Sequence, residues 1–291
     1  MSEYVIVTDS ALDMNQEMVD RLGADVLPIT FNIRGTSLKN YPDHREMPLK
    51  EFYQLLREGE VATTSAVNVH EYLEKLTPIL AGGKDILLMV FDAVLSMTTF
   101  QSANLAAEEL REKFPERKII VEDTRCVSGG LYLLLWHACR MQKEGKSMEE
   151  VRDWCEANKY HVCHWFTVDD LHYLKRGGRL SAASAVVGTM LQIKPVLHVD
   201  HEGALVNVGK ARGRNASLTA LVDRMEKTAI NPAGQTVFIC HGDCLADAEK
   251  VAEDVKKRMN PKEIYIGDFG PVIGAHTGPG IVALFFLGTE R

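Results

Sequence analysis

Three short segments of the chain carry side chains that could hold an anion. Hydroxyl groups cluster at Thr63–Ser65 and again at Ser96–Gln101. Arg179 follows Gly177 and Gly178, so a pliable turn presents a planar guanidinium whose shape suits a carboxylate. Hydroxyls and free backbone amides at the start of a helix also bind carboxylate or phosphate groups. These segments therefore favour the binding of a negatively charged ligand.

A fourth candidate is His276, which lies in a segment with five glycines between residues 267 and 280. Such a loop lets the backbone approach a ligand closely, and an imidazole can exchange a hydrogen bond or a proton with it. No obvious metal partners stand at ligand spacing from His276, so no metal site is expected. A purely structural hydrogen bond of the imidazole is the alternative.

Each of these segments also has an ordinary structural interpretation. Thr63–Ser65 could form a turn stabilised by its own hydroxyls, and the basic residues around Arg179 could form a solvated turn. Thr8, Asp9 and Ser10 follow a predicted strand, at the place where open α/β sheets bind ligands. Asp9 or Ser10 could instead simply cap the next helix.

Composition narrows the classes of function. The chain has 291 residues, of which 46% are hydrophobic and 25% charged, as in a globular protein. Its net charge of -7 argues against general attraction to nucleic acid or to anionic lipids. The longest apolar run, Leu131–Trp136, is far shorter than the roughly 20 residues that a membrane helix needs. The first residues lack the features of a signal peptide, so a cytoplasmic protein with reduced cysteines is expected.

Several familiar catalytic and nucleotide-binding motifs are absent from the sequence. It contains no G-x-x-x-x-G-K-[ST] loop, no G-x-G-x-x-G after the first predicted strand, no G-x-S-x-G and no H-E-x-x-H. The common nucleotide and hydrolase chemistries lose support, and no cofactor is expected.

The elements that must position these residues alternate between strands and helices in the first half of the chain. Apolar runs typical of buried strands occur at Tyr4–Val7, Val26–Phe31, Ile86–Phe91 and Lys118–Val121. Helical patterns occupy residues 47–58, 69–80, 101–114, 129–143 and 147–158. Asn68 with Glu71, and Ser147 with Glu150, have the spacing of capping boxes. The alternation predicts a parallel sheet with helices on both faces, a three-layer α/β/α domain.

The second half has a different pattern of strands. They are expected near Cys163–Val168, Ile193–Val199, Leu205–Val208, Thr236–His241, Ile264–Gly267 and Val282–Phe286. The turn-forming segment Asp200–Gly203 favours a hairpin and hence a mixed sheet. We therefore predict a two-domain α/β protein, with an N-terminal domain at residues 1–160 and a C-terminal domain at residues 161–291.

In order, the motifs resemble those of the DegV family of bacterial fatty-acid-binding proteins. They are V-T-D-S at Val7–Ser10, T-T-S at Thr63–Ser65, F-Q-S-A at Phe100–Ala103, E-D-T at Glu122–Thr124, D-D-L-x-Y-L-K-R-G-G-R-L at Asp169–Leu180, I-K-P-V-L at Ile193–Leu197 and G-P-V-I-G-A-H-T-G-P-G at Gly270–Gly280. The series spans nearly the whole chain. The resemblance implies the two-domain DegV-like fold, with one long-chain fatty acid enclosed between the domains.

The resemblance also implies which residues surround the acyl carboxylate. Carried over to this chain, they are Thr64, Ser65, Arg179 and His276. Where the family usually has S-S-x-L-S-G-T-Y-Q-S-A, this chain reads A-V-L-S-M-T-T-F-Q-S-A at 93–103, so Ala93 and Val94 replace the serine pair. Ser96 is the candidate substitute if the loop is rearranged.

The function implied by the resemblance is binding without catalysis. Family members present the fatty acid to a separate fatty acid kinase subunit, which would be the partner here. The alternative from the residues themselves is an acyl hydrolase or acyltransferase with Ser96 or Thr64 as nucleophile, His276 as base and Asp268 as the orienting acid. A lipid-sensing regulator without acyl transfer is a third interpretation.

Overall fold

The first half of the chain forms a sheet in which all strands are parallel. The computed structural model describes residues 3–180, 192–289 and 291. The strand order is β2-β1-β6-β7. The strands are β1 (Tyr4–Asp9), β2 (Asp25–Leu27), β6 (Asp85–Val90) and β7 (Ile119–Asp123). All six residues of β6 are buried, as expected of a strand covered on both faces.

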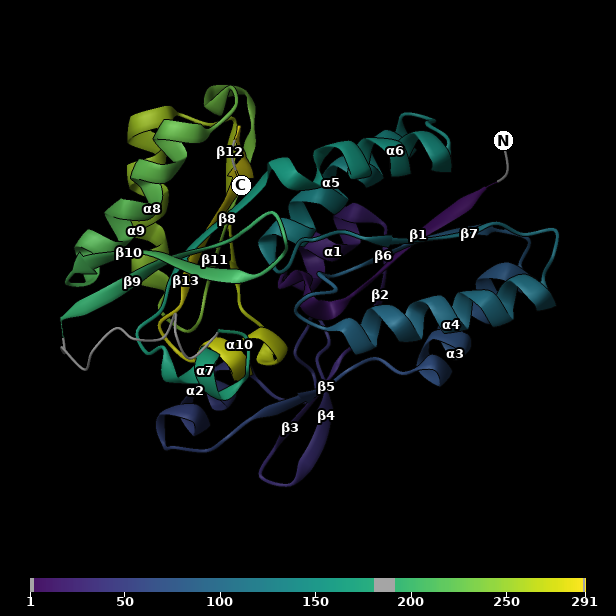
Figure 1. Ribbon diagram of the computed structural model, residues 1–291, viewed down its shortest axis with the longest axis horizontal. Helices are drawn as coiled ribbons and strands as arrows, with labels where there is room; N and C mark the ends of the chain where they lie inside the picture. The colour runs from purple at the N-terminus through teal and green to yellow at the C-terminus, as the bar shows by residue number, and fades with distance from the viewer. Residues whose placement is uncertain (1–2, 181–191, 290) are drawn as a thin grey trace.

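Helices cover both faces of this sheet. They are α1 (Gln16–Leu22), α3 (Val69–Ala81), α4 (Met97–Lys113), α5 (Gly129–Lys143) and α6 (Met148–Asn158), whereas α2 (Leu49–Arg57) lies away from this sheet, against the second half of the chain. In Figure 1, α3 and α4 lie on one side of the sheet, while α5 and α6 lie on the other. Both predicted capping boxes form, at the starts of α3 and α6. The arrangement confirms the predicted parallel three-layer fold.

The second half forms the predicted mixed sheet of six strands. The order is β10-β9-β8-β13-β11-β12, in which β11 and β12 pair in parallel and the other pairs are antiparallel. The strands are β8 (Val162–Thr167), β9 (Ile193–Val199), β10 (Leu205–Arg212), β11 (Thr236–His241), β12 (Glu263–Asp268) and β13 (Val282–Leu287). The predicted hairpin is the β9–β10 pair.

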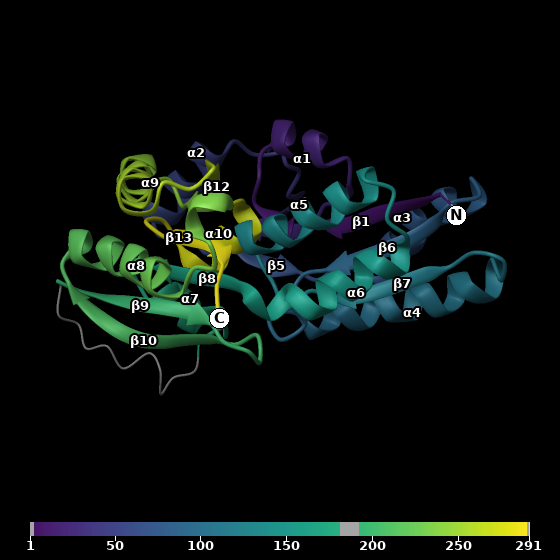
Figure 2. The same ribbon diagram turned by 90° about the horizontal axis from the view of Figure 1, so that it is seen from above.

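Helix α5 links the two sheets. Helices α8 (Arg214–Thr228) and α9 (Leu245–Met259) pack against one another and against strands of the second sheet. Helix α5 also packs against β8, β11 and β13. Figure 2 shows the two sheets toward opposite ends of the molecule, with α5 between them. Gly129 begins α5 so close to Phe285 that a Cβ there would lie 2.5 Å from the ring.

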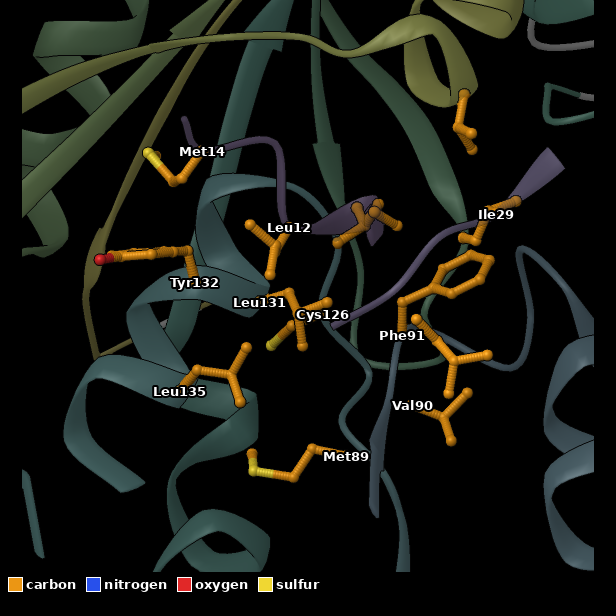
Figure 3. Close-up of a cluster of buried hydrophobic side chains, with 14 of the residues drawn as sticks. Leu12, Met14, Ile29, Met89, Val90, Phe91, Cys126, Leu131, Tyr132 and Leu135 are labelled. Atoms are coloured by element: carbon orange, nitrogen blue, oxygen red, sulfur yellow. The ribbon is translucent and has the colours of Figure 1, made fainter. Parts of the chain in front are cut away.

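One hydrophobic core runs across the predicted border near residue 160. Leu131 and Leu135 of α5 belong to the same buried cluster as Phe238 and Phe285 of the second sheet. Figure 3 shows part of this cluster, in which Leu131 lies beside Leu12. All strands of the first sheet precede residue 160 and all those of the second follow it. The division into two domains stays a prediction.

A third, small antiparallel sheet supports the candidate site. Its strand order is β4-β3-β5, with β3 (Thr30–Ile33), β4 (Thr36–Lys39) and β5 (Thr63–Ser65). Two short helices of the second half, α7 (His172–Arg176) and α10 (Pro271–Thr277), pack against one another, and α10 also packs against β3 and β5. These elements lie close together in Figure 1.

Two predictions about local structure are wrong, and one alternative interpretation and one helix boundary also differ from the structure. Val26–Phe31 is not one strand: it is divided at Pro28 between β2 and β3, because proline has no amide hydrogen to donate to a sheet. The turn suggested as an alternative for Thr63–Ser65 does not form, because this segment is strand β5. The glycine-rich segment around His276 is partly helical, as α10. Helix α4 also begins at residue 97, four residues before its predicted start.

Candidate functional site

An apolar cavity of about 360 Å³ lies among the three sheets. Both halves of the chain contribute to its wall. The apolar lining includes Ile29, Phe91, Val127, Phe166, Leu174, Val199, Leu205, Phe269, Val272, Ile281, Ala283 and Phe285. Ile29 and Phe91 lie next to one another in Figure 3. The volume falls within the roughly 300–1,000 Å³ typical of small-molecule sites.

Three of the predicted site residues meet at the wall of this cavity. Thr64 lies on β5, Arg179 follows α7, and His276 lies near the end of α10. Thr64 Oγ1 and His276 Nε2 are 2.8 Å apart. We call these three residues the polar cluster. It forms because α10 packs against both β5 and α7.

Arg179 brings a half-buried positive charge to the cavity. Its Nη1 donates to the carbonyl of Gly177 at 2.6 Å and its Nη2 to the carbonyl of Leu95 at 3.0 Å. Burial lowers the pKa of Arg179, but a guanidinium remains protonated in proteins. Within the described part of the chain, no carboxylate lies at ion-pair distance from it. A charge in this position favours an anionic ligand, because a buried charge without a counter-charge is costly.

His276 is neutral at physiological pH. Burial, together with the charges of Arg179 and Arg176, lowers the pKa of His276 to about 4. Its Nδ1 is buried without a hydrogen-bond partner among the described residues. Because an unpaired buried N–H costs more than an unpaired lone pair, we assign the proton to Nε2, which then donates to Thr64 Oγ1. The Thr64 hydroxyl is left free to donate its own hydrogen to a ligand.

The lowered pKa of His276 makes the stability of the ligand-free protein depend on pH. The unfolded chain takes up a proton near pH 6.5, whereas the folded protein does so only near pH 4. Between these values the unfolded state binds more protons, so stability falls as the pH falls. Urea unfolding measures the free energy of unfolding of the wild type and of His276→Gln. The amount by which the wild type exceeds the variant should shrink as the pH is lowered from about 7 to about 5. A difference that stays constant would contradict the buried, neutral imidazole.

Gly177 leaves the space that His276 occupies. A Cβ on Gly177 would collide with His276 Nδ1, whereas its backbone φ of -73° allows any residue. Gly177→Ala is therefore expected to fold but to break the contact between Thr64 and His276, which a shift of the His276 ring ¹⁵N signals in NMR would reveal. Gly209→Ala is the matched control, because its Cβ would make an ordinary contact at 3.5 Å. Ring signals unchanged in Gly177→Ala would count against this geometry.

The two remaining predicted residues, Ser65 and Ser96, also line the cavity. Ser65 accepts a hydrogen bond from Asn32 Nδ2 at 3.2 Å, and its side chain faces opposite to that of Thr64 because residues alternate along a strand. Ser96 precedes α4, and its Oγ lies 2.9 Å from Thr99 Oγ1. Their roles in ligand binding stay predictions.

The start of α4 adds free backbone donors to the site. The Ser96 hydroxyl caps no backbone amide of the helix, and Met97, Thr98 and Thr99 of its first turn line the cavity. The first amides of a helix have no partner within it and carry partial positive charge. Ala93 is buried and Val94 is exposed, and neither side chain has a hydroxyl.

Thr8, Asp9 and Ser10 have structural rather than ligand-binding positions. Asp9 accepts hydrogen bonds from the amides of Ala11 and Phe91, at 3.0 and 3.1 Å. Thr8 donates to the carbonyl of Met89, and Ser10 Oγ accepts from the amide of Ile29. The capping interpretation of this segment is correct.

The arrangement expected of a hydrolase is incomplete. Thr64 lies within hydrogen-bond distance of His276, but Asp268 lies 3.5 Å from His241 Nε2 instead of orienting His276. No group of three or more histidine, cysteine, aspartate or glutamate side chains suitable for a metal ion is found among the described residues.

Sequence analysis missed two contributors to the site. The backbone carbonyl of Leu95 accepts a hydrogen bond from Arg179, and no sequence signal identifies such a carbonyl. His164 lines the cavity from β8, with its Nε2 accepting from the amide of Val127 at 3.2 Å. A histidine within an otherwise apolar strand was the available signal for His164.

Together, the fold and the site define an α/β protein with an apolar cavity that carries a cationic polar cluster, an arrangement suited to an amphipathic anion. A family model described as "Uncharacterised protein, DegV family" matches residues 3–289. The chain belongs to the DegV family.

Relatives of known sequence or structure resemble the chain over its whole length. A DegV domain-containing protein of Clostridium perfringens is 44% identical over 291 residues, which are 100% of this chain and 99% of that protein. A Thermus thermophilus structure described as showing fatty acid binding of a DegV family protein has a TM-score of 0.86 and 29% identity, covering 99% and 100% of the chains. The structure of DegV from Bacillus subtilis, described as a fatty acid binding protein, has a TM-score of 0.85 and 26% identity, also covering 99% and 100%.

Across the described residues, no helix combines the length and the apolar character needed to span a bilayer.

Proposed function

We propose that the protein binds one long-chain fatty acid, with the carboxylate at the polar cluster and the acyl chain in the apolar cavity. The observation that carries the proposal is the guanidinium of Arg179, which faces an apolar cavity and bonds only to backbone carbonyls among the described residues. Solved relatives from Thermus thermophilus and Bacillus subtilis are described as fatty-acid-binding, which supports the same ligand class.

Energetics explain why the polar cluster matters. Removing about 15 methylenes from water contributes roughly 12 kcal/mol at about 0.8 kcal/mol each. A free fatty acid, however, resides mostly in bilayers, where its tail is already away from water. The tail contribution then nearly cancels, and charge-assisted hydrogen bonds to the carboxylate, at about 1.5–3 kcal/mol each, supply much of the selectivity.

We further propose that the protein performs no chemistry itself and presents the bound acid to a separate fatty acid kinase. The sequence has no nucleotide-binding loop, in keeping with a partner that supplies the phosphoryl donor. The hydrolase alternative has the Thr64–His276 contact in its favour, at 2.8 Å, but lacks the predicted orienting acid.

The test is mass spectrometry of whatever co-purifies with the protein after denaturing extraction. We expect one long-chain fatty acid per protein, and uptake of palmitic acid from vesicles by protein stripped of lipid. Protein that purifies empty and takes up no fatty acid would refute the binding function. Cleavage of a chromogenic acyl ester that His276→Gln abolishes would favour the hydrolase.

A further inference from the structure

Helix α10, which carries His276, is held at its start by a side chain from the first half of the chain. Gly270 precedes the helix and has no side chain with which to cap it. Asp13 Oδ1 accepts a hydrogen bond from the Gly270 amide at 2.8 Å, in a buried position and across 257 residues of sequence. Asp13 follows the 3-10 helix Ser10–Leu12 and is 5% exposed.

Little free space surrounds the backbone of Gly270 where it bonds to Asp13. A Cβ on Gly270 would lie 2.9 Å from Asn40 Oδ1 and 3.2 Å from Asp13 Oδ1. Asn40 is held in turn by the carbonyl of Ser10, to which its Nδ2 donates at 3.1 Å. One residue earlier, the hydroxyl of Tyr53 donates to the carbonyl of Phe269 at 2.8 Å. The first half of the chain thus holds both residues that lead into α10.

The other end of α10 also contacts the first half of the chain, because His276 bonds to Thr64 in the polar cluster. The helix has only seven residues, so its start and His276 are less than two turns apart. A short helix moves as a rigid unit, and a shift at Gly270 would therefore displace the imidazole from Thr64. Gly274 in the middle packs against Phe52, where a Cβ would lie 2.8 Å from the ring, so α10 has little freedom to compensate.

We propose that Asp13 is a positioning residue for the polar cluster: its carboxyl fixes the start of α10, so that His276 meets Thr64 in the geometry that receives a carboxylate. The inference rests on the proposed fatty acid function and adds a residue that neither lines the cavity nor belongs to the polar cluster. Asp13 Oδ2 has no hydrogen-bond partner among the described residues, so a single acceptor atom holds the Gly270 amide.

The backbone conformation of Asp13 allows substitutions that change the side chain without straining the chain. Its φ of 51° and ψ of 42° lie in the left-handed region, which glycine and asparagine tolerate well. Asp13→Gly removes the carboxyl without backbone strain, and Asp13→Asn keeps an oxygen in the place of Oδ1. Burial also raises the pKa of Asp13 well above its ordinary value, so an uncharged amide is a close substitute. Arg57→Gln is the control, because it removes an exposed link to Asp243 that does not involve α10.

The experiment compares palmitic acid with its methyl ester by displacement of a fluorescent fatty acid from each variant. Asp13→Gly is expected to lose at least tenfold in affinity for the acid and less than twofold for the ester, whereas Asp13→Asn and Arg57→Gln stay within threefold for both. Tyr53→Phe should shift the ratio of the two affinities in the same direction by a smaller factor. An unchanged ratio in Asp13→Gly, or an equal loss in Asp13→Asn, would overturn the inference.

A second measurement on ligand-free protein separates this inference from the proposed function. The ¹⁵N signals of the His276 ring are expected to shift both in Asp13→Gly and in Thr64→Val, and to stay in place in Arg57→Gln. Unshifted signals in Asp13→Gly refute the positioning role whatever the ligand is. Wild-type protein that does not prefer the acid over the ester refutes the proposed function, while the ring signals still decide the role of Asp13.

Discussion

Arg179→Ala is expected to weaken fatty acid binding roughly 10- to 100-fold. The substitution removes the one charged group of the polar cluster, and a charge-assisted hydrogen bond contributes about 1.5–3 kcal/mol, where about 1.4 kcal/mol is a factor of ten. Because Arg179 has no carboxylate partner among the described residues, its charge is available to the carboxylate of the ligand. This loss of affinity should exceed the loss caused by shortening the fatty acid by one methylene. A methylene is buried in the bilayer as well as in the protein, so its contribution to exchange between the two nearly cancels.

The measurement is retention of palmitic acid in exchange with vesicles, compared with retention of the acid one methylene shorter. Arg176→Ala is the matched control, because Arg176 is an exposed arginine on α7 that lies over the Tyr173 ring and lines no part of the cavity. Arg179→Lys should fall between the two, since an ammonium keeps the charge but loses the planar fork. Equal retention by wild type and Arg179→Ala would show that the carboxylate is held elsewhere.

Lys159→Met is expected to destabilise the fold by about 3–5 kcal/mol. Lys159 Nζ lies 2.9 Å from Glu122 Oε1 and 3.0 Å from the carbonyl of Asp123, and the side chains of both ion-pair partners are less than 10% exposed. Removing one member of a buried pair leaves the other charge without compensation. The contact joins the end of β7 to the segment that precedes β8 in the second sheet. Its removal should therefore lower the stability of both sheets together.

Urea unfolding of wild type and Lys159→Met measures this cost. Burial raises the pKa of Glu122 to about 7, so the loss should be larger at about pH 8, where the wild-type carboxylate is mostly charged and pairs with Lys159, than at about pH 6, where it is mostly protonated. Lys118→Met is the control, because the pair of Lys118 with Glu149 is exposed at 66% and 44%, and exposed pairs contribute at most about 1 kcal/mol. Similar losses in the two variants would contradict the importance of the buried pair.

Most of the helices and strands could be predicted from local pattern. Helix α5 lies at the predicted residues 129–143, and α3 and α6 begin at their predicted capping boxes. After Asp85, the all-buried strand β6 is a continuous apolar run, Ile86–Val90. These predictions succeed because burial on one face or on both imposes a period that the residue types display directly.

The small sheet was not predictable in the same way. Thr63–Ser65 has three residues and no apolar alternation, so its residue pattern did not predict a strand. It is a strand because it pairs with β3, where Thr64 lies opposite Phe31. The strand conformation thus depends on a partner some 30 residues away, which no local window contains.

The sequence by itself determined the family, the parallel and mixed sheets, and the residue types available to hold an acid, because those follow from ordered motifs and from periodic burial. The resemblance already implied that Thr64, Arg179 and His276 surround one ligand, but only the tertiary structure decided which contacts join them beside the apolar cavity. The bond between Thr64 and His276 spans 212 residues, and it exists because α10 packs on the small sheet while Asp13 holds the residue before its first turn. Such contacts depend on how separate elements pack, and local residue preferences do not specify them.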